Sequence, residues 1–315
     1  MVRNSQPTGE SKEGIKASRN AHGNPRHVKV PLDGSKKKEY SLAHLTVMGC
    51  DPPEMTYIAA RAGYDYVGFR LIPMGIKGEP TYLPGDKAMI RRTRTALKET
   101  GVRMLDLELA RILKDVDPES FLPAMETTAE LGGRHVISSA WTTDPTDRSF
   151  IIERYAQICD LAAPFGLTVN LEFPSFSRIT NLQEAADIVG AAGRPNSGIL
   201  VDTLYFHFAR VGFEELDALP SGWFHFMHIC DTDEDSPISR NQMRHVARDE
   251  RLYFGEGHIN FKEILRHLPE VPYAIELPNI ERVRELGYEE HAKRCLETAR
   301  LSIEGSGPRL STSLA

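Results

Sequence analysis

Short apolar runs alternate with longer segments of helical spacing along most of the chain, beginning near residue 41. The runs are rich in β-branched and aromatic residues, as buried strands are. We expect eight strands, at Leu42–Met48, Tyr64–Leu71, Val102–Leu109, His135–Ser139, Leu167–Phe173, Gly198–Thr203, Trp223–Cys230 and Val271–Leu277. The segments between them carry apolar residues on one helical face, as Phe150, Ile151, Tyr155, Ile158, Cys159, Ala162 and Phe165 do within 147–165, and Ala292, Cys295, Leu296 and Ala299 do in the last helix. Eight such β–α units, with strands apolar on both faces, predict a parallel sheet.

Capping and turn residues support the same elements. Asp117 before Pro118 predicts a helix start, and Thr180 with Gln183 predicts a capping box before the fifth helix. Glycines stand where helices must end, at Gly101, Gly132, Gly133 and Gly166. No GxGxxG or phosphate-binding loop follows the first strand, and polar residues collect at the ends of many strands. We therefore expect an α/β fold, the eight-stranded parallel (β/α)8 TIM barrel, over residues 41–305.

Both ends of the chain differ from this pattern. Residues 1–40 hold nine Lys or Arg against four Asp or Glu, with frequent Gly, Ser, Asn and Pro and no periodic apolar positions. Such a segment buries too little apolar area to offset its ordering entropy. It is predicted to be a flexible basic extension or an arm that docks on a partner subunit, with a nucleic-acid-binding tail as the alternative. Residues 306–315 are predicted to be a disordered tail.

Composition narrows the class of protein. The net charge of −6 and pI near 6.0 argue against a nucleic-acid-binding protein. No apolar stretch approaches the roughly 18 residues that span a bilayer, and the amino terminus has no apolar signal region, so no membrane partner and a cytoplasmic location are expected. The cysteines form no CxxC pair and are expected to be reduced core thiols, at Cys50, Cys159, Cys230 and Cys295.

Four consecutive strands end in residues that bind metals. Glu172, Asp202, His228 and Glu276 lie at the carboxyl ends of the fifth to eighth predicted strands, and such side chains point into the shared mouth of a barrel. Burying three carboxylates and an imidazole together without a cation is strongly unfavourable. The sequence therefore predicts one divalent metal, and the oxygen-rich set suits Mn, Mg or Co better than a closed thiolate zinc site. The alternative is that Glu172 and Glu276 pair with arginines at the mouth.

The motifs around these residues resemble those of a known family. They are Leu-Glu172-Phe, Val-Asp202 followed by a histidine and Arg210, Met-His228-Ile-Cys-Asp231, Gly255-Glu256-Gly257-His258-Ile259-Asn260-Phe261, and Ile-Glu276. Over roughly residues 41–303 the chain resembles the xylose-isomerase-like barrels, and among them the sugar phosphate isomerase/epimerase group with its ketose 3-epimerases and inosose dehydratases. Related barrels are often dimers or tetramers, so a homo-oligomer is expected.

The resemblance implies roles for the four ligands. They would hold one divalent ion, Mn²⁺ first, with Mg²⁺, Co²⁺ or Zn²⁺ as alternatives. Glu172 and Glu276 would also face each other across a carbohydrate or polyol substrate, one removing a proton beside a carbonyl and the other returning one on the opposite face. The metal would stabilise the enediolate. The expected enzyme is a metal-dependent isomerase or epimerase acting on a keto-sugar or related polyol.

The chain departs from the family pattern at two strands. The substrate-contacting histidine that often follows Asp202 after two residues is here His207, with four residues between. The His-x-His often found on strand seven has Phe226 at its first position, which indicates a more apolar wall and a less polar substrate. His225 falls on the opposite strand face from His228 and is expected to be packed structure. Further substrate-binding candidates are Arg70, Glu108, Trp141, His207, Asp231, Arg251 and His258.

The insertion Asp231–Gly257 is rich in charge and includes Arg240, Arg244, His245, Arg248 and Arg251. It is interpreted as a lid or as the carrier of an arginine that binds an anionic substrate, against a solvated charged loop.

Three other functions are compatible with parts of the pattern. A lyase, either an inosose or dehydroshikimate-type dehydratase or a 3-keto-glycoside β-eliminating enzyme, would use the same metal site with His207 or His258 as general acid. A DNA-repair endonuclease shares the barrel but needs a metal cluster with extra histidines, which strands two to four do not offer. A barrel that only binds a ligand would not need the intact ligand set.

Overall fold

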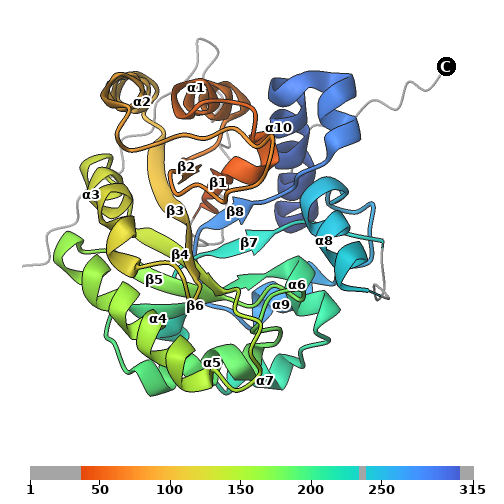
Figure 1. The fold of residues 1–315 in the computed structure, drawn as a ribbon. Coiled ribbons are helices and arrows are strands. Elements are labelled where there is room, and N and C mark those ends of the chain that lie inside the picture. The colour runs from red at the N-terminus through yellow and green to blue at the C-terminus, as the bar shows by residue number, and fades with distance from the viewer. Residues whose placement is uncertain (1–36, 234–238, 306–315) are drawn as a thin grey trace, which may run out of the picture. The chain divides into compact units, whose positions relative to one another are not determined.

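Eight parallel strands close into one barrel in the structure, a computed structural model that describes residues 37–233 and 239–305 (Figure 1). The strands are β1 (Tyr40–Leu42), β2 (Tyr66–Arg70), β3 (Arg103–Ile112), β4 (His135–Ala140), β5 (Thr168–Glu172), β6 (Ser197–Asp202), β7 (Met227–Ile229) and β8 (Tyr273–Ile275). Each strand pairs with its neighbour in sequence, and β1 also pairs with β8. The predicted TIM barrel is confirmed.

Helices surround the strand ring, as Figure 1 shows. They are α1 (Pro52–Ala62), α2 (Lys87–Thr100), α3 (Leu122–Glu130), α4 (Arg148–Ala162), α5 (Leu182–Ala192), α6 (Thr203–Phe208), α7 (Phe213–Asp217), α8 (Arg240–Asp249), α9 (Phe261–Arg266) and α10 (Ile280–Glu304). Short 3-10 turns add η1 (His44–Val47), η2 (Pro118–Phe121), η3 (Ala163–Phe165) and η4 (Ser221–Trp223). Within the described residues, no helix combines the length and the apolar character needed to cross a membrane.

Two apolar cores follow from the alternation of side chains along the strands. The larger core lies between strands and helices, and includes the predicted buried faces of α4 and α10. The smaller core fills the barrel interior with Tyr66, Leu105, Leu109, Ile137, Leu200, Phe226 and Ala274. This inner core closes the barrel below the mouth, as side-chain layers do in such barrels.

The first strand was placed too late along the chain. Strand β1 ends at Leu42, and the apolar residues after it form the turn η1. His44 organises this turn, because its Nδ1 accepts the backbone N–H of Arg70 and its Nε2 donates to the carbonyl oxygen of Cys50 (both 2.9 Å). The seventh strand is also shorter than expected, because it begins at Met227 and the predicted first residue, Trp223, ends the turn η4.

The predicted capping box at Thr180 and Gln183 is wrong by one residue. Asn181 caps α5 by accepting the N–H of Glu184 at 2.9 Å, and the Glu184 carboxylate accepts the N–H of Thr180 at 3.2 Å. Asp117 caps η2 as expected, by accepting the N–H of Glu119.

The prediction about the cysteines is confirmed, whereas those about the two terminal segments stay predictions. All four cysteines are buried and free, as expected. The described residues from Lys38 onward form one compact unit. Residues 1–36 of the predicted flexible extension and residues 306–315 of the predicted tail lie outside the described residues. The extension was predicted to reach residue 40, but Tyr40 already belongs to β1.

Candidate metal centre and active site

The four predicted metal ligands meet at the carboxyl end of the barrel. Glu172 and Asp202 are the last residues of β5 and β6, His228 is the middle residue of β7, and Glu276 directly follows β8. One ligand atom from each lies within 4.8 Å of the ligand atoms of the others. The four side chains are almost completely buried. Parallel strands bring their carboxyl ends to one edge, which explains why residues far apart in sequence converge here.

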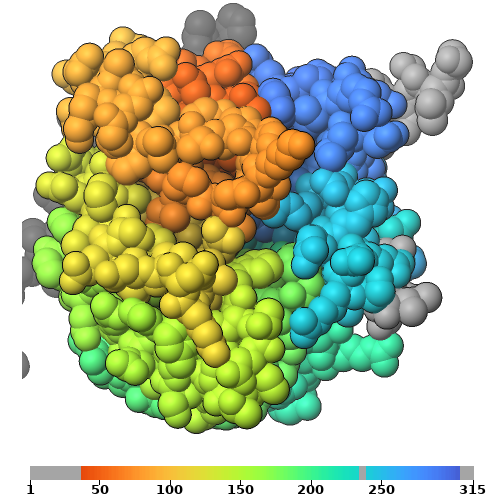
Figure 2. Space-filling model, viewed as in Figure 1, coloured from red at the N-terminus to blue at the C-terminus, as the bar shows by residue number. Residues whose placement is uncertain are grey.

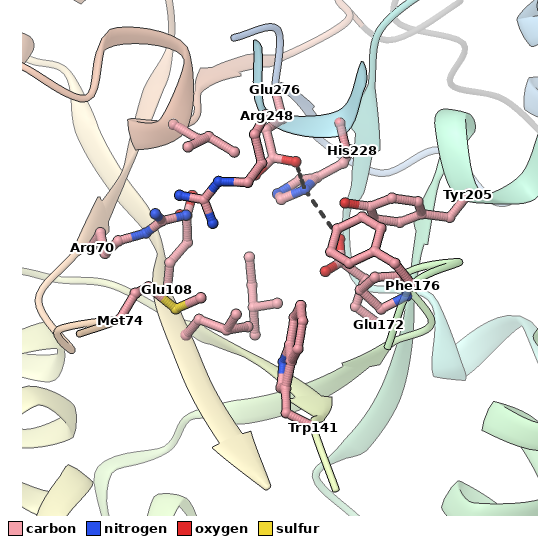
Figure 3. A pocket seen from close by; sticks show the side chains of 15 residues that line it. Arg70, Met74, Glu108, Trp141, Glu172, Phe176, Tyr205, His228, Arg248 and Glu276 are labelled. Carbon is pink, nitrogen blue, oxygen red and sulfur yellow. Dashed lines mark hydrogen bonds and ion pairs between the residues drawn. The ribbon is translucent and has the colours of Figure 1, made fainter. Parts of the chain in front are cut away.

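His228 lies between the two glutamates. Its Nδ1 is 3.6 Å from Glu172 Oε1 and 3.4 Å from Glu276 Oε2 (Figure 3). Burial lowers the pKa of His228, but Glu276 and Glu172 raise it well above its usual value. Burial raises the pKa of Glu172 to about 7, against the effect of His228. Burial also acts to raise the pKa of Glu276, but His228 and Arg251 outweigh it and hold that pKa below its usual range.

Arg251 lies behind the ligands and joins two of them. Its Nη1 donates to Asp202 Oδ2 at 2.7 Å and its Nη2 to Glu276 Oε2 at 2.6 Å. Its Nε donates to the carbonyl oxygen of Ala247 in α8 at 2.9 Å, and the side chain is 0% exposed. Asp202 Oδ1 accepts the backbone N–H of Leu204 at 2.8 Å. Asp202 and Glu276 are thus oriented by a fixed cation.

The donor set fits a divalent metal. Glu172 Oε1 and both ring nitrogens of His228 are buried without a hydrogen-bond partner among the described residues. Buried polar atoms in proteins nearly always have a hydrogen-bond or metal partner. Three such atoms that converge without one indicate a binding site for a further group, such as a metal ion. Three carboxylates and one imidazole form an oxygen-rich set of the kind that binds Mn²⁺, Mg²⁺ or related ions. The alternative to a metal was that Glu172 and Glu276 both pair with arginines. Glu276 does pair with Arg251, whereas among the described residues no arginine pairs with Glu172.

A cationic wall borders the ligands on one side. Arg70 and Glu108, both predicted substrate-binding candidates, line the pocket over the ligands, together with Arg248. Arg70 donates to Glu108 at 2.8 Å and to Glu79 at 2.6 Å, and Arg248 approaches the same Glu79 oxygen at 3.3 Å. Figure 3 shows the guanidinium groups of Arg70 and Arg248 close together at one side of the pocket.

An aromatic wall lies across the pocket from these arginines, as Figure 3 shows. It consists of Trp141, Phe176 and Tyr205, all of which line the pocket. The rings of Trp141 and Phe176 lie 5.7 Å apart, and those of Phe176 and Tyr205 lie 5.9 Å apart, edge to face. The indole Nε1 of Trp141 donates to Ser139 at 2.7 Å, which fixes the ring orientation. Such a surface suits the apolar faces of a sugar or polyol ring.

The structure places three other candidates away from the pocket. His207 lies on α6 and lines a separate hollow with Arg210 and Phe213. His258 is exposed and does not line the pocket over the ligands. Asp231 is buried, and its carboxylate accepts the backbone N–H groups of Gly255, Gly257 and Ile259, so it shapes the loop that carries the Gly-Glu-Gly motif.

The inference drawn from Phe226 is wrong. Phe226 belongs to the inner core, 1% exposed, and stacks on His135 at 5.1 Å below the ligand layer. Phe226 therefore does not line the pocket. It gives no reason to expect a less polar substrate. His225 is packed structure as expected, with its Nδ1 donating to Asn170 at 2.7 Å.

Sequence reasoning missed several residues of the site. Glu79 and Phe176 lie in loops, and Tyr205 follows Asp202 on α6, so none ends a strand. Asp106 lies below the pocket on β3, buried and with both carboxylate oxygens unpartnered among the described residues. The only available signal was the charge of an aspartate within the otherwise apolar run Met104–Leu107.

A closed parallel (β/α)8 barrel with a buried carboxylate and histidine site at its mouth defines a class of protein. The chain belongs to the Xylose isomerase-like TIM barrel family, which matches residues 57–298. A relative is the inosose isomerase of Bacillus velezensis (strain DSM 23117 / BGSC 10A6 / LMG 26770 / FZB42), 28% identical over 191 residues, which are 58% of this chain. The match spans 66% of that relative, just under two thirds of its length.

Solved structures show the same fold. The IOLI protein with a bound zinc atom superposes with a TM-score of 0.71 at 19% identity, over 85% of this chain and 98% of that one. The D-allulose 3-epimerase of Methylomonas sp. in complex with D-allulose superposes with a TM-score of 0.61 at 19% identity, also over 85% and 98%.

Proposed function

We propose that the protein is a divalent-metal-dependent isomerase or epimerase acting on a keto-sugar or related polyol. The observation that carries the proposal is the placement of two carboxylates, Glu172 and Glu276, on either side of His228 at the floor of one pocket. They come from strands on different sides of the mouth, so they can flank one carbon of a bound substrate. The names of an inosose isomerase and a D-allulose 3-epimerase among similar proteins support the same reaction class.

The two glutamates have unequal surroundings. Glu276 is held by Arg251 at 2.6 Å, whereas Glu172 Oε1 has no hydrogen-bond partner among the described residues. We assign proton removal beside the carbonyl to Glu172, because no arginine among the described residues holds it and burial raises its pKa to about 7, which makes it the stronger base of the two. Glu276, which is ionised beside Arg251, then relays a proton from water to the opposite face. A divalent metal, when bound, supplies Lewis-acid stabilisation of the negative charge that develops on the substrate.

The metal is proposed to be Mn²⁺, on the ground of the oxygen-rich ligand set. The structure of the IOLI protein contains zinc, which makes Zn²⁺ the second choice, ahead of Mg²⁺ and Co²⁺.

The lyase alternative is less well supported, because it needs a general acid for the leaving group. The two histidines expected in that role, His207 and His258, do not line the pocket. Tyr205 does line it, but burial raises the pKa of Tyr205 well above its usual value, which makes its hydroxyl a poor acid near neutral pH. An isomerase uses the same carboxylates and metal site but needs no general acid for a leaving group.

Exchange of substrate hydrogen with deuterated water tests this function. Keto-sugars and inososes are incubated with the Mn²⁺-loaded protein, and deuterium beside the carbonyl is measured by mass spectrometry. Glu172→Gln is expected to abolish exchange, and exposed Glu281→Gln serves as the matched control. Bound metal is determined in each variant by elemental analysis. Full exchange in Glu172→Gln would refute the assignment, and a stable unsaturated product would favour the lyase.

A further inference from the structure

Arg248 stands at the edge of the pocket with an incompletely neutralised charge. It lies on α8, 25% exposed, and its ion pair among the described residues is with Glu79 at 3.3 Å. Glu79 Oε1 already accepts Arg70 at 2.6 Å, so one carboxylate serves two guanidinium groups. Ion pairs with a shared acceptor leave donors of the second guanidinium available to another anion.

A third guanidinium, that of Arg111, lies near Arg70 and Arg248 without lining either cavity. Arg111 donates to the carbonyl oxygen of Met74 at 2.9 Å, and burial lowers its pKa, with further lowering by Arg70 and Arg248. Glu79 and Asp115 act in the opposite direction on Arg111, so the three arginines face three carboxylates, Glu79, Glu108 and Asp115. The group is formally neutral, so what it offers a ligand is the single guanidinium of Arg248 that shares its acceptor, and this suits one carboxylate better than a phosphate ester with its charge of about −2.

The shape of the site directs substrate toward Arg248. The space directly over the ligands is about 50 Å³, far below the roughly 300 Å³ at the lower end of small-molecule sites. A second cavity of about 420 Å³ lies beside it, and Arg248 and Leu45 line both spaces. In Figure 2 the orange segment after β2 and the cyan α8 border the hollow on this face. A substrate larger than the first space extends past Arg248.

We propose that Arg248, positioned by Glu79 and Arg70, binds one carboxylate group of the substrate and selects acidic keto-sugars or keto-polyols over neutral ones. This inference rests on the proposed function, since it deepens the substrate class of the same site. The carbonyl end of the substrate lies over Glu172 and Glu276, and its carboxylate reaches the boundary between the two cavities. Glu79 competes for the same guanidinium and so weakens the binding of an anion.

A matched pair of probes tests the inference. 5-Keto-D-gluconate and L-sorbose share one carbon skeleton and carbonyl, and differ in a carboxylate against a hydroxymethyl group. Binding of each to the Mn²⁺-loaded protein is measured by titration calorimetry, and deuterium exchange is followed separately. The wild type is expected to bind 5-keto-D-gluconate about tenfold or more tightly than L-sorbose, since charge-assisted hydrogen bonds carry that much. This preference should fall as NaCl is raised.

Two substitutions have opposite expected effects. Arg248→Gln should weaken 5-keto-D-gluconate about tenfold and leave L-sorbose unchanged, whereas Glu79→Gln should tighten the acid only. Exposed Arg240→Gln on the same helix is the control and should change neither. A purely structural role of Arg248 would alter both probes alike. If Arg248→Gln does not fold, the affinity of Glu79→Gln for 5-keto-D-gluconate tests the proposal. Tighter binding of the acid supports it, and unchanged binding overturns it.

The outcomes separate this inference from the proposed function. A preference for the acid that Arg248→Gln removes, without deuterium exchange in either probe, supports the carboxylate site and contradicts isomerase activity on these two sugars. Exchange in both probes with equal affinities, unchanged in the variants, supports the isomerase and overturns the carboxylate site. Failure of the wild type to prefer the acid also overturns the carboxylate site.

Discussion

Replacing Arg251 by methionine removes the cation that joins two metal ligands. Arg251 is 0% exposed and donates to Asp202 at 2.7 Å and to Glu276 at 2.6 Å. Methionine fills a similar volume without charge, so the substitution leaves two buried carboxylates without their counter-ion. Loss of one partner of a buried ion pair costs about 3–5 kcal/mol. A domain is stable by about 5–15 kcal/mol, so this is a large share of the free energy of unfolding.

The magnitude is measured by urea unfolding followed by circular dichroism, in EDTA and again with Mn²⁺. The midpoint should fall at an unchanged m-value, because the unfolded surface is the same. Mn²⁺ should restore part of the loss, since a bound cation also neutralises Asp202 and Glu276. Exposed Arg240→Met is the control and should cost less than about 0.5 kcal/mol. A loss below about 1 kcal/mol for Arg251→Met would contradict the argument that Arg251 compensates the ligands.

Three further results follow from the same geometry. Removal of the metal by a chelator should lower the free energy of unfolding by about 2.7 kcal/mol, compared with protein at a metal concentration of 100 Kd. Calorimetry measures this difference, and an unchanged free energy of unfolding would contradict a bound metal. Burial raises the pKa of Asp106 from 3.8 to about 8, so the folded state keeps a proton that the unfolded state loses, and stability falls as pH rises from about 4 to 8. Asp106→Asn should therefore stabilise the metal-free protein more at pH 8 than at pH 5 in urea unfolding, and an equal effect at both would contradict this. Trp141→Ala should raise KM for the substrate with a smaller change in kcat, because its ring lines the pocket without contacting the ligands' polar atoms, and an unchanged KM would exclude the ring from binding.

Strand placement could be predicted because it depends on local apolar patterns. The runs ending in Glu172 and Asp202 have both faces buried, so periodicity and length located them well. The first strand was misplaced because His44 and the residues after it are apolar enough to resemble a strand, yet hydrogen bonds to Cys50 and Arg70 fold them into a turn. Those contacts lie outside the window that a local pattern reads.

The roles of residues outside the strands were harder to predict. His207 follows Asp202 closely in sequence, but the helical turn of α6 directs it to a separate hollow, and Tyr205 lines the pocket instead. Arg251 was predicted as a substrate-binding residue, but it packs behind Asp202, 49 residues away in sequence. No spacing rule separates these outcomes, because they depend on the path of the loops.

The ligand set is what the sequence by itself determined. A parallel barrel brings every strand end to one mouth, so Glu172, Asp202, His228 and Glu276 had to meet once the strands were placed. The walls of the pocket were decided only by the tertiary structure. Arg248 on α8 meets Glu79 in the loop after β2, 169 residues away in sequence, because the whole fold brings these two segments together. Strand ends are positioned by regular hydrogen bonding, whereas loop side chains are positioned by long-range contacts that no local pattern encodes.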